Sequence, residues 1–133
     1  MDTTSVRNRA CEKAGNAMYF SVDAKYPRSS ETLRQAAQAH LQRSGRAHHG
    51  SGYVTFRFMV DCAGNRQPRT QVLQTDAHYH SFHFSKELVE ELYGFLKTLT
   101  DWRAATAGEG NSVNYLGYLT FKIKDGKVVA VIP

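Results

Sequence analysis

Three histidines lie close together in the segment 77–84, and histidine is the side chain that most often binds transition metals. In an extended strand, His78 and His80 would point to the same face and could hold a divalent cation between them. Asp76 is the one carboxylate near enough in sequence to assist them. We therefore predict no metal site, and keep His78, His80 and His83 as the residues to check.

Two cysteines, Cys11 and Cys62, are the other residues with reactive or ligating side chains. A single pair lacks the four ligands that a structural zinc ion needs, so zinc is excluded. An even number of cysteines in a small protein is compatible with one disulfide in an oxidising compartment. The alternative is two unrelated thiols, and the sequence leaves both open.

The usual arrangements of catalytic residues are missing. The chain has no Gly-x-Ser-x-Gly, no phosphate-binding glycine loop and no His-Glu-x-x-His. The one pair of adjacent carboxylates, Glu90 and Glu91, falls on a predicted helix, where neighbouring residues do not face each other. We therefore predict a non-enzymatic protein without a cofactor.

The charge of the chain is uneven. Its 133 residues have a net charge of +5, but residues 1–70 carry +6 and residues 71–133 carry −1. A basic half suggests an acidic partner surface, a nucleic acid or a membrane face, or simply a solvated surface. The longest apolar run, 128–132, is far shorter than a spanning helix, so we predict no membrane span.

The pattern of apolar residues predicts the elements that position these side chains. Period-two alternation indicates strands at 53–60, 70–75, 115–124 and 128–132. Capping serines and helical spacing predict helices that begin near Ser29 or Ser30 and at Ser85. A further helix is expected at 5–18, a loop at 104–113 and a tight hairpin at Asp125-Gly126. Together they predict an α+β fold: one domain, 1–133, with an antiparallel sheet and two or three helices packed on one face.

The strand 53–60 bears on nucleic-acid binding, because its aromatic residues are similar to those of RNA-recognition motifs. Phe56 and Phe58 share a face with Val54 and Val60, so they belong to a core and are not free to stack on bases. The sequence therefore argues against a nucleic acid as partner, although the basic first half keeps a cytoplasmic adaptor or nucleic-acid-binding protein as the alternative function.

Several short motifs together resemble the C-terminal domain of TonB-like proteins of Gram-negative envelopes. Tyr26-Pro27 and the helix ending at His40-Leu41 are similar to a Phe-Pro-Gly-Gly segment and the helix that follows it. The stretch 52–64 resembles Gly-x-Val-x-Val-x-Phe-x-Val-Asp-x-x-Gly. The likeness continues in the segments 71–73, 88–102 and 119–121, and it covers roughly residues 24–124.

The sequence also departs from that family. Arg28-Ser29-Ser30 replaces the two glycines, and the second Tyr-Pro before the first long strand is absent. A hairpin, 119–132, is added at the C-terminal side. The chain has no membrane anchor and no Pro-rich spacer, which leaves a cytoplasmic location as the alternative to the periplasm or cell envelope.

The resemblance implies a mode of binding. In the family, an extended segment of an outer-membrane receptor adds a strand to an exposed sheet edge. By analogy the edge would be 115–124, or 128–132 if that strand lies outside it, unless the last strand instead blocks the site. The resemblance thus implies a protein or peptide partner and the partner-binding residues Tyr118, Thr120, Lys122, Val129 and Val131. It does not indicate the oligomeric state.

Overall fold

The computed structural model describes residues 11, 16–18, 25–107 and 111–133. Within these residues two helices and six strands follow one another along the chain, and the predicted α+β class is confirmed. The helices are α1 (Ser30–Arg43) and α2 (Lys86–Thr98). The strands are β1 (Asn16–Met18), β2 (Gly52–Val60), β3 (Arg66–Asp76), β4 (Ala105–Ala107), β5 (Asn111–Lys124) and β6 (Lys127–Ile132).

Both helices begin where serine can cap them. The hydroxyl of Ser29 accepts a hydrogen bond from the Thr32 amide at 3.1 Å, and that of Ser85 accepts one from the Leu88 amide at 3.2 Å. Each cap satisfies a backbone donor that the helix itself leaves unpaired and contributes about 1 kcal/mol. The helix starts expected from the sequence are therefore confirmed.

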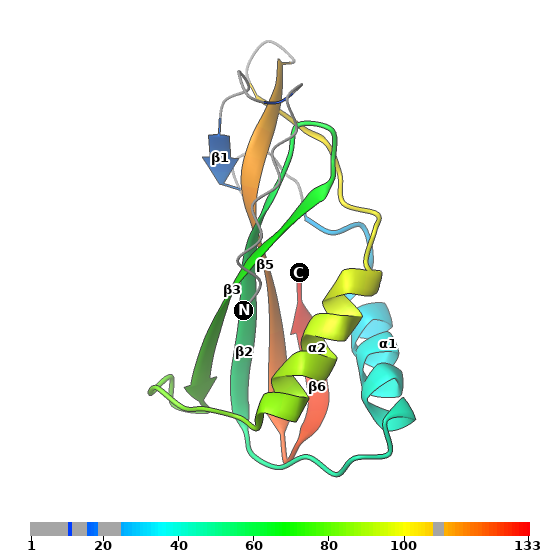
Figure 1. Cartoon of the computed structure of the whole chain (residues 1–133), viewed down its shortest axis with the longest axis vertical. Helices are drawn as coiled ribbons and strands as arrows, with labels where there is room; N and C mark the ends of the chain where they lie inside the picture. The colour runs from blue at the N-terminus through cyan, green and yellow to red at the C-terminus, as the bar shows by residue number, and fades with distance from the viewer. Residues whose placement is uncertain (1–10, 12–15, 19–24, 108–110) are drawn as a thin grey trace. The chain divides into compact units, whose positions relative to one another are not determined.

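The strands form a sheet with the order β1-β5-β2-β3, in which β4 and β6 also pair with β5. Figure 1 shows β6 beside β5. β6 returns antiparallel to β5 through a hairpin whose two central residues, Asp125 and Gly126, have φ of 50° and 75°. Positive φ at both positions is what this turn requires. A Cβ atom at Gly126 would overlap the carbonyl of His48, so only glycine fits there.

The chain divides into two compact units. Unit 1 comprises residues 1–27, 57–71 and 100–118, and unit 2 comprises residues 28–56, 72–99 and 119–133. β2, β3 and β5 each contribute residues to both units. The prediction that residues 1–133 form a single domain stays a prediction.

The core of unit 2 is the layer between the two helices and the sheet. α1 packs against β6 and against α2, and Figure 1 shows the two helices side by side. Phe121 of β5 meets the rings of Phe56 and Phe95 at centroid distances of 5.8 and 6.0 Å. The alternation predicted for the strands is confirmed by the burial of one face, which includes Val54, Phe56, Leu119, Phe121 and Ile123.

The core of unit 1 is built around Trp102. Its ring packs edge-on against Tyr26 and Phe58, with centroid distances of 4.5 and 4.9 Å. Tyr115 is completely buried, and its hydroxyl donates to the Arg103 carbonyl at 3.0 Å. A disulfide joins Cys11 to Cys62 in the same unit, with their Cα atoms 5.5 Å apart.

Three expected elements differ in the structure. Asn16–Met18 form a strand that pairs in parallel with β5, where a helix over 5–18 was expected, and residues 5–10 and 12–15 lie outside the described residues. The expected loop 104–113 contains β4 and the start of β5, which pair with each other. β3 begins at Arg66 and not at residue 70. For β1, pairing with the distant strand β5 overrides local propensity, whereas β4 pairs with residues of β5 only a few positions later in the chain.

Candidate functional site

The strand β5 is not an edge of the sheet. Thr120 lies beside Thr55 of β2, with their hydroxyl oxygens 2.9 Å apart, and on its other side it pairs with Ile132 of β6. Lys122 likewise pairs with Ala130 of β6. The free edge expected over 115–124 is therefore not found at Thr120 and Lys122, because strands lie on both sides of β5 there. The assignment of Tyr118, Thr120 and Lys122 as partner-binding residues stays a prediction.

The strand β6 lies outside β5, but helix α1 covers part of it. The side-chain oxygen of Gln38 accepts a hydrogen bond from the Val128 amide at 2.8 Å, so an outward donor of this strand is already used. Val131 is fully buried, whereas Val129 is 39% exposed beside an irregularity in the pairing with β5. Of the predicted contact residues on β6, Val131 therefore belongs to the core, and Val129 alone is exposed.

The strand β3 ends the sheet on the side opposite β6, and among the described strands it pairs with β2 only. Pro68 lies within β3, and proline in a sheet is typical of edge strands, at positions whose nitrogen faces away from the ladder. Since backbone groups alternate along a strand, the amides of Thr70 and Val72 point to the same outward side as the Pro68 nitrogen. An isolated bridge from Thr75 to Ser81 occupies the far end of this edge.

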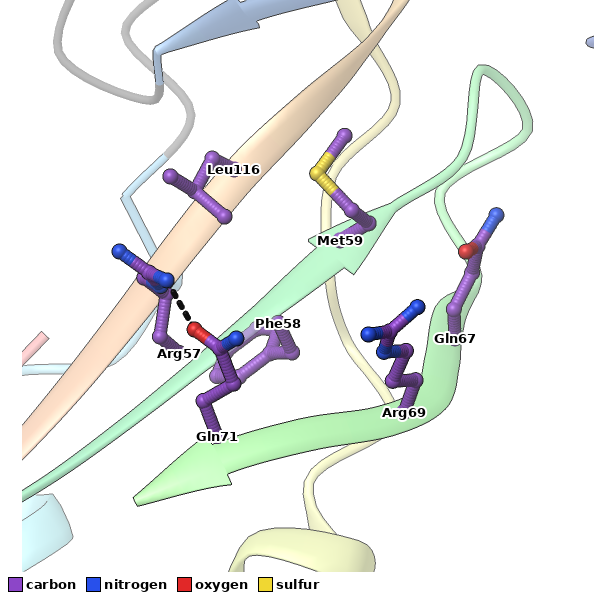
Figure 2. A pocket seen from close by; sticks show the side chains of 7 residues that line it. All are labelled: Arg57, Phe58, Met59, Gln67, Arg69, Gln71 and Leu116. Atoms are coloured by element: carbon purple, nitrogen blue, oxygen red, sulfur yellow. Dashed lines mark hydrogen bonds between the residues drawn. The ribbon is translucent and has the colours of Figure 1, made fainter. Parts of the chain in front are cut away.

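A cleft of about 420 Å³ lies beside β3 within unit 1. Figure 2 shows the side chains that line it: Arg57, Phe58, Met59, Gln67, Arg69, Gln71 and Leu116. They come from β2, β3 and β5. Gln67, Arg69 and Gln71 are alternate residues of β3 and therefore share one face of the sheet. The cleft thus runs alongside the edge strand and is lined by long polar side chains over Met59 and Leu116.

The charge of this cleft is positive. The Arg57 guanidinium donates a hydrogen bond to the side-chain oxygen of Gln71, which holds it in place (Figure 2). Within the described residues, no carboxylate is paired with Arg57 or Arg69. Asp76 is the one acidic residue in β2, β3, β5 and β6, whose basic residues are Arg57, Arg66, Arg69, Lys122, Lys124 and Lys127.

The histidine cluster is a turn after β3. The Asp76 carboxylate accepts hydrogen bonds from the backbone amides of His78 and His80 at 2.8 and 3.0 Å. These bonds, that of His80 first, lower the pKa of Asp76. The rings of His78 and His80 are 6.4 Å apart, and within the described residues no group of three or more metal-ligating side chains is found, His83 included.

The two cysteines carry no free thiol, because they are joined to each other. The side chain of Asn114 on β5 bridges the pair: its oxygen accepts from the Cys62 amide at 2.9 Å, and its nitrogen donates to the Cys11 carbonyl at 3.3 Å. Cys62 is therefore no nucleophile in this state, and the arrangement is a cross-link between two distant segments.

The edge at β3 and the residues of the cleft were not predicted from the sequence. One signal was available: Pro68 lies two residues before the predicted strand 70–75, and a strand extended to include this proline would have been predicted as an edge. The meeting of Arg57 with Gln71 could not be read from spacing, because it depends on how β2 and β3 pair.

Within the described residues, no helix has the length and apolar character needed to cross a membrane. No protein-family model, curated protein or solved structure matches this chain.

Proposed function

We propose that this chain is a non-enzymatic protein- or peptide-binding module of the cell envelope that binds an extended segment by strand addition at β3. The observation that carries the proposal is the different surroundings of β5, β6 and β3. β5 is flanked by strands, β6 is covered in part by α1 and Gln38, and β3 pairs with β2 only among the described strands.

Strand addition suits this edge energetically. An extended segment beside β3 would accept hydrogen bonds from the amides of Thr70 and Val72 and donate to the carbonyls of the same two residues. Each such bond contributes about 1 kcal/mol net. Backbone bonds supply affinity without selecting a sequence, so side chains in the adjoining cleft would provide the selectivity.

Two observations support the proposed location of this chain in the cell envelope. The disulfide between Cys11 and Cys62 is typical of an oxidising compartment such as the periplasm. The order α1, β2, β3, α2, β5, with the short strand β4 inserted before β5, is compatible with the order expected from the resemblance to TonB-like C-terminal domains. A segment of an outer-membrane receptor is the partner that this resemblance implies, which would link the chain to TonB-type transport.

The test begins with a random library of linear peptides displayed on phage and panned against the disulfide-bonded protein. A synthetic copy of a recovered peptide is then added while amide hydrogen exchange is followed by NMR. We expect new protection at the amides of Thr70 and Val72 and none along β6, because only β3 gains a neighbour. Recovery of no linear peptide, or protection on β6 and not on β3, contradicts the proposal.

A matched pair of variants isolates the backbone contribution. Val72→Pro removes an outward amide that does not bond to β2, whereas Val72→Ala removes a similar side chain and keeps the amide. We expect Val72→Pro to bind the peptide about fivefold more weakly than Val72→Ala, as one lost hydrogen bond implies. Equal affinity of two folded variants, verified by thermal melting, would show that no bond forms at this amide.

A further inference from the structure

We infer that the segment added at β3 is acidic, and that Arg69 and Arg57 recognise carboxylates on its alternate residues. This inference rests on the proposed function and names the chemistry of the partner at that same edge.

The cleft lies beside the edge strand β3. Gln67, Arg69 and Gln71 project on one face of the edge strand and line the cleft. A strand added beside β3 would place the side chains of its own alternate residues about 5 Å from those opposite them, measured between Cβ atoms. One row of the partner's side chains would therefore lie directly against Arg69 and its neighbours.

The cleft is positively charged, because Arg57 and Arg69 line it. Within the described residues the guanidinium groups of Arg57 and Arg69 have no carboxylate partner, and Arg57 is already oriented by Gln71. A guanidinium presents a planar fork of donors that matches a carboxylate and binds it with short, charge-assisted hydrogen bonds. A basic side chain in the same row would instead be repelled.

The two arginines extend into the cleft from neighbouring strands. Arg69 is on the edge strand itself, whereas Arg57 is on β2, one strand further in, and its guanidinium extends to Gln71 (Figure 2). Glutamate has the longer side chain, so we expect it to reach the inner guanidinium of Arg57 more readily than aspartate does. The expected recognition element is an extended segment with glutamates at every second position.

The test uses blocked synthetic peptides of equal length that alternate Thr with Glu, Thr with Gln or Thr with Lys. Affinity for the disulfide-bonded protein is measured by isothermal titration, and the site by amide exchange of β3. We expect the Thr-Glu peptide to bind about tenfold more tightly than the Thr-Gln peptide, because charged acceptors form stronger bonds. The Thr-Lys peptide should bind more weakly than both.

Variants of the two arginines test whether the cleft causes the preference for acidic peptides. Arg69→Gln should reduce the affinity for the Thr-Glu peptide to that for the Thr-Gln peptide and leave the latter unchanged, and Arg57→Gln should act in the same direction. Arg43→Gln, at an exposed residue of α1 that does not line the cleft, makes the same change in net charge and should retain the preference.

The outcomes separate this inference from the proposed function. If the Thr-Glu and Thr-Gln peptides bind equally and both protect β3, strand addition stands and the acidic preference is wrong. If no peptide protects β3, both are wrong. Binding of a single-stranded oligonucleotide is measured as well. Affinity that falls steeply with salt and is lost in Arg69→Gln would overturn the peptide assignment in favour of a nucleic acid.

Discussion

At the scale of single residues, Tyr115 shows how an alternating strand can bury a polar group. Its ring is fully buried within unit 1, and its hydroxyl donates to the Arg103 carbonyl. Burial raises the pKa of Tyr115 to about 12, against the smaller opposing effect of the Arg103 guanidinium. The buried hydroxyl is hydrogen-bonded, as a buried polar group requires.

The raised pKa predicts how stability depends on alkaline pH. Because the folded state holds this proton more tightly than the unfolded state, the contribution is complete below the unfolded pKa of about 10 and is lost as pH rises toward 12. Tyr115→Phe should lose about 1 kcal/mol near neutral pH and lack this alkaline decline. Urea unfolding of both proteins at about pH 8 and about pH 11 measures the difference, and equal differences at the two values would contradict the prediction.

At the scale of elements, the strands β6 and β3 are protected in different ways. On β6, Gln38 of the neighbouring helix accepts the outward amide of Val128. On β3, Pro68 removes one outward donor and the bridge from Thr75 to Ser81 covers the end. Proteins commonly protect edge strands in such ways, since an exposed edge can pair with another chain. The segment between these two features is the part that the proposed function uses.

Gln38→Ala tests the protection of β6. The loss of the acceptor should lower the free energy of unfolding by about 1 kcal/mol and accelerate amide exchange at Val128, because that amide loses its partner. Gln35→Ala is the matched control, since the Gln35 side chain donates a hydrogen bond to exposed Glu31 on the same helix. If the two variants behave alike, Gln38 does not secure this edge.

At the scale of the whole molecule, the disulfide joins residues 51 positions apart. Closing a loop of this length restricts the unfolded chain and is expected to stabilise the folded state by about 4 kcal/mol. The same bond decides how the protein responds to its compartment, because a reducing environment would remove this contribution.

The double variant Cys11→Ser with Cys62→Ser should therefore unfold with a free energy about 4 kcal/mol lower than the wild type. Denaturant unfolding with and without reductant measures this effect. The wild type should respond to reductant and the double variant should not. An unchanged unfolding free energy in reduced wild type would mean that the cross-link contributes nothing to stability.

Much of the local structure follows from the sequence alone. The caps at Ser29 and Ser85, the buried face of β2 and the turn at Asp125-Gly126 depend on residues within a few positions of one another. Propensity, periodicity and turn chemistry act over that range, so these elements were predicted correctly.

Only the tertiary structure decided which strand is an edge. The same alternation is found in β5, which lies between other strands, and in β3, which ends the sheet. The hydrogen bond from the Val128 amide to Gln38 joins positions 90 residues apart, and that from Arg57 to Gln71 joins positions 14 residues apart. No local pattern encodes such pairings, because their free energy depends on which distant segments the folded chain brings together.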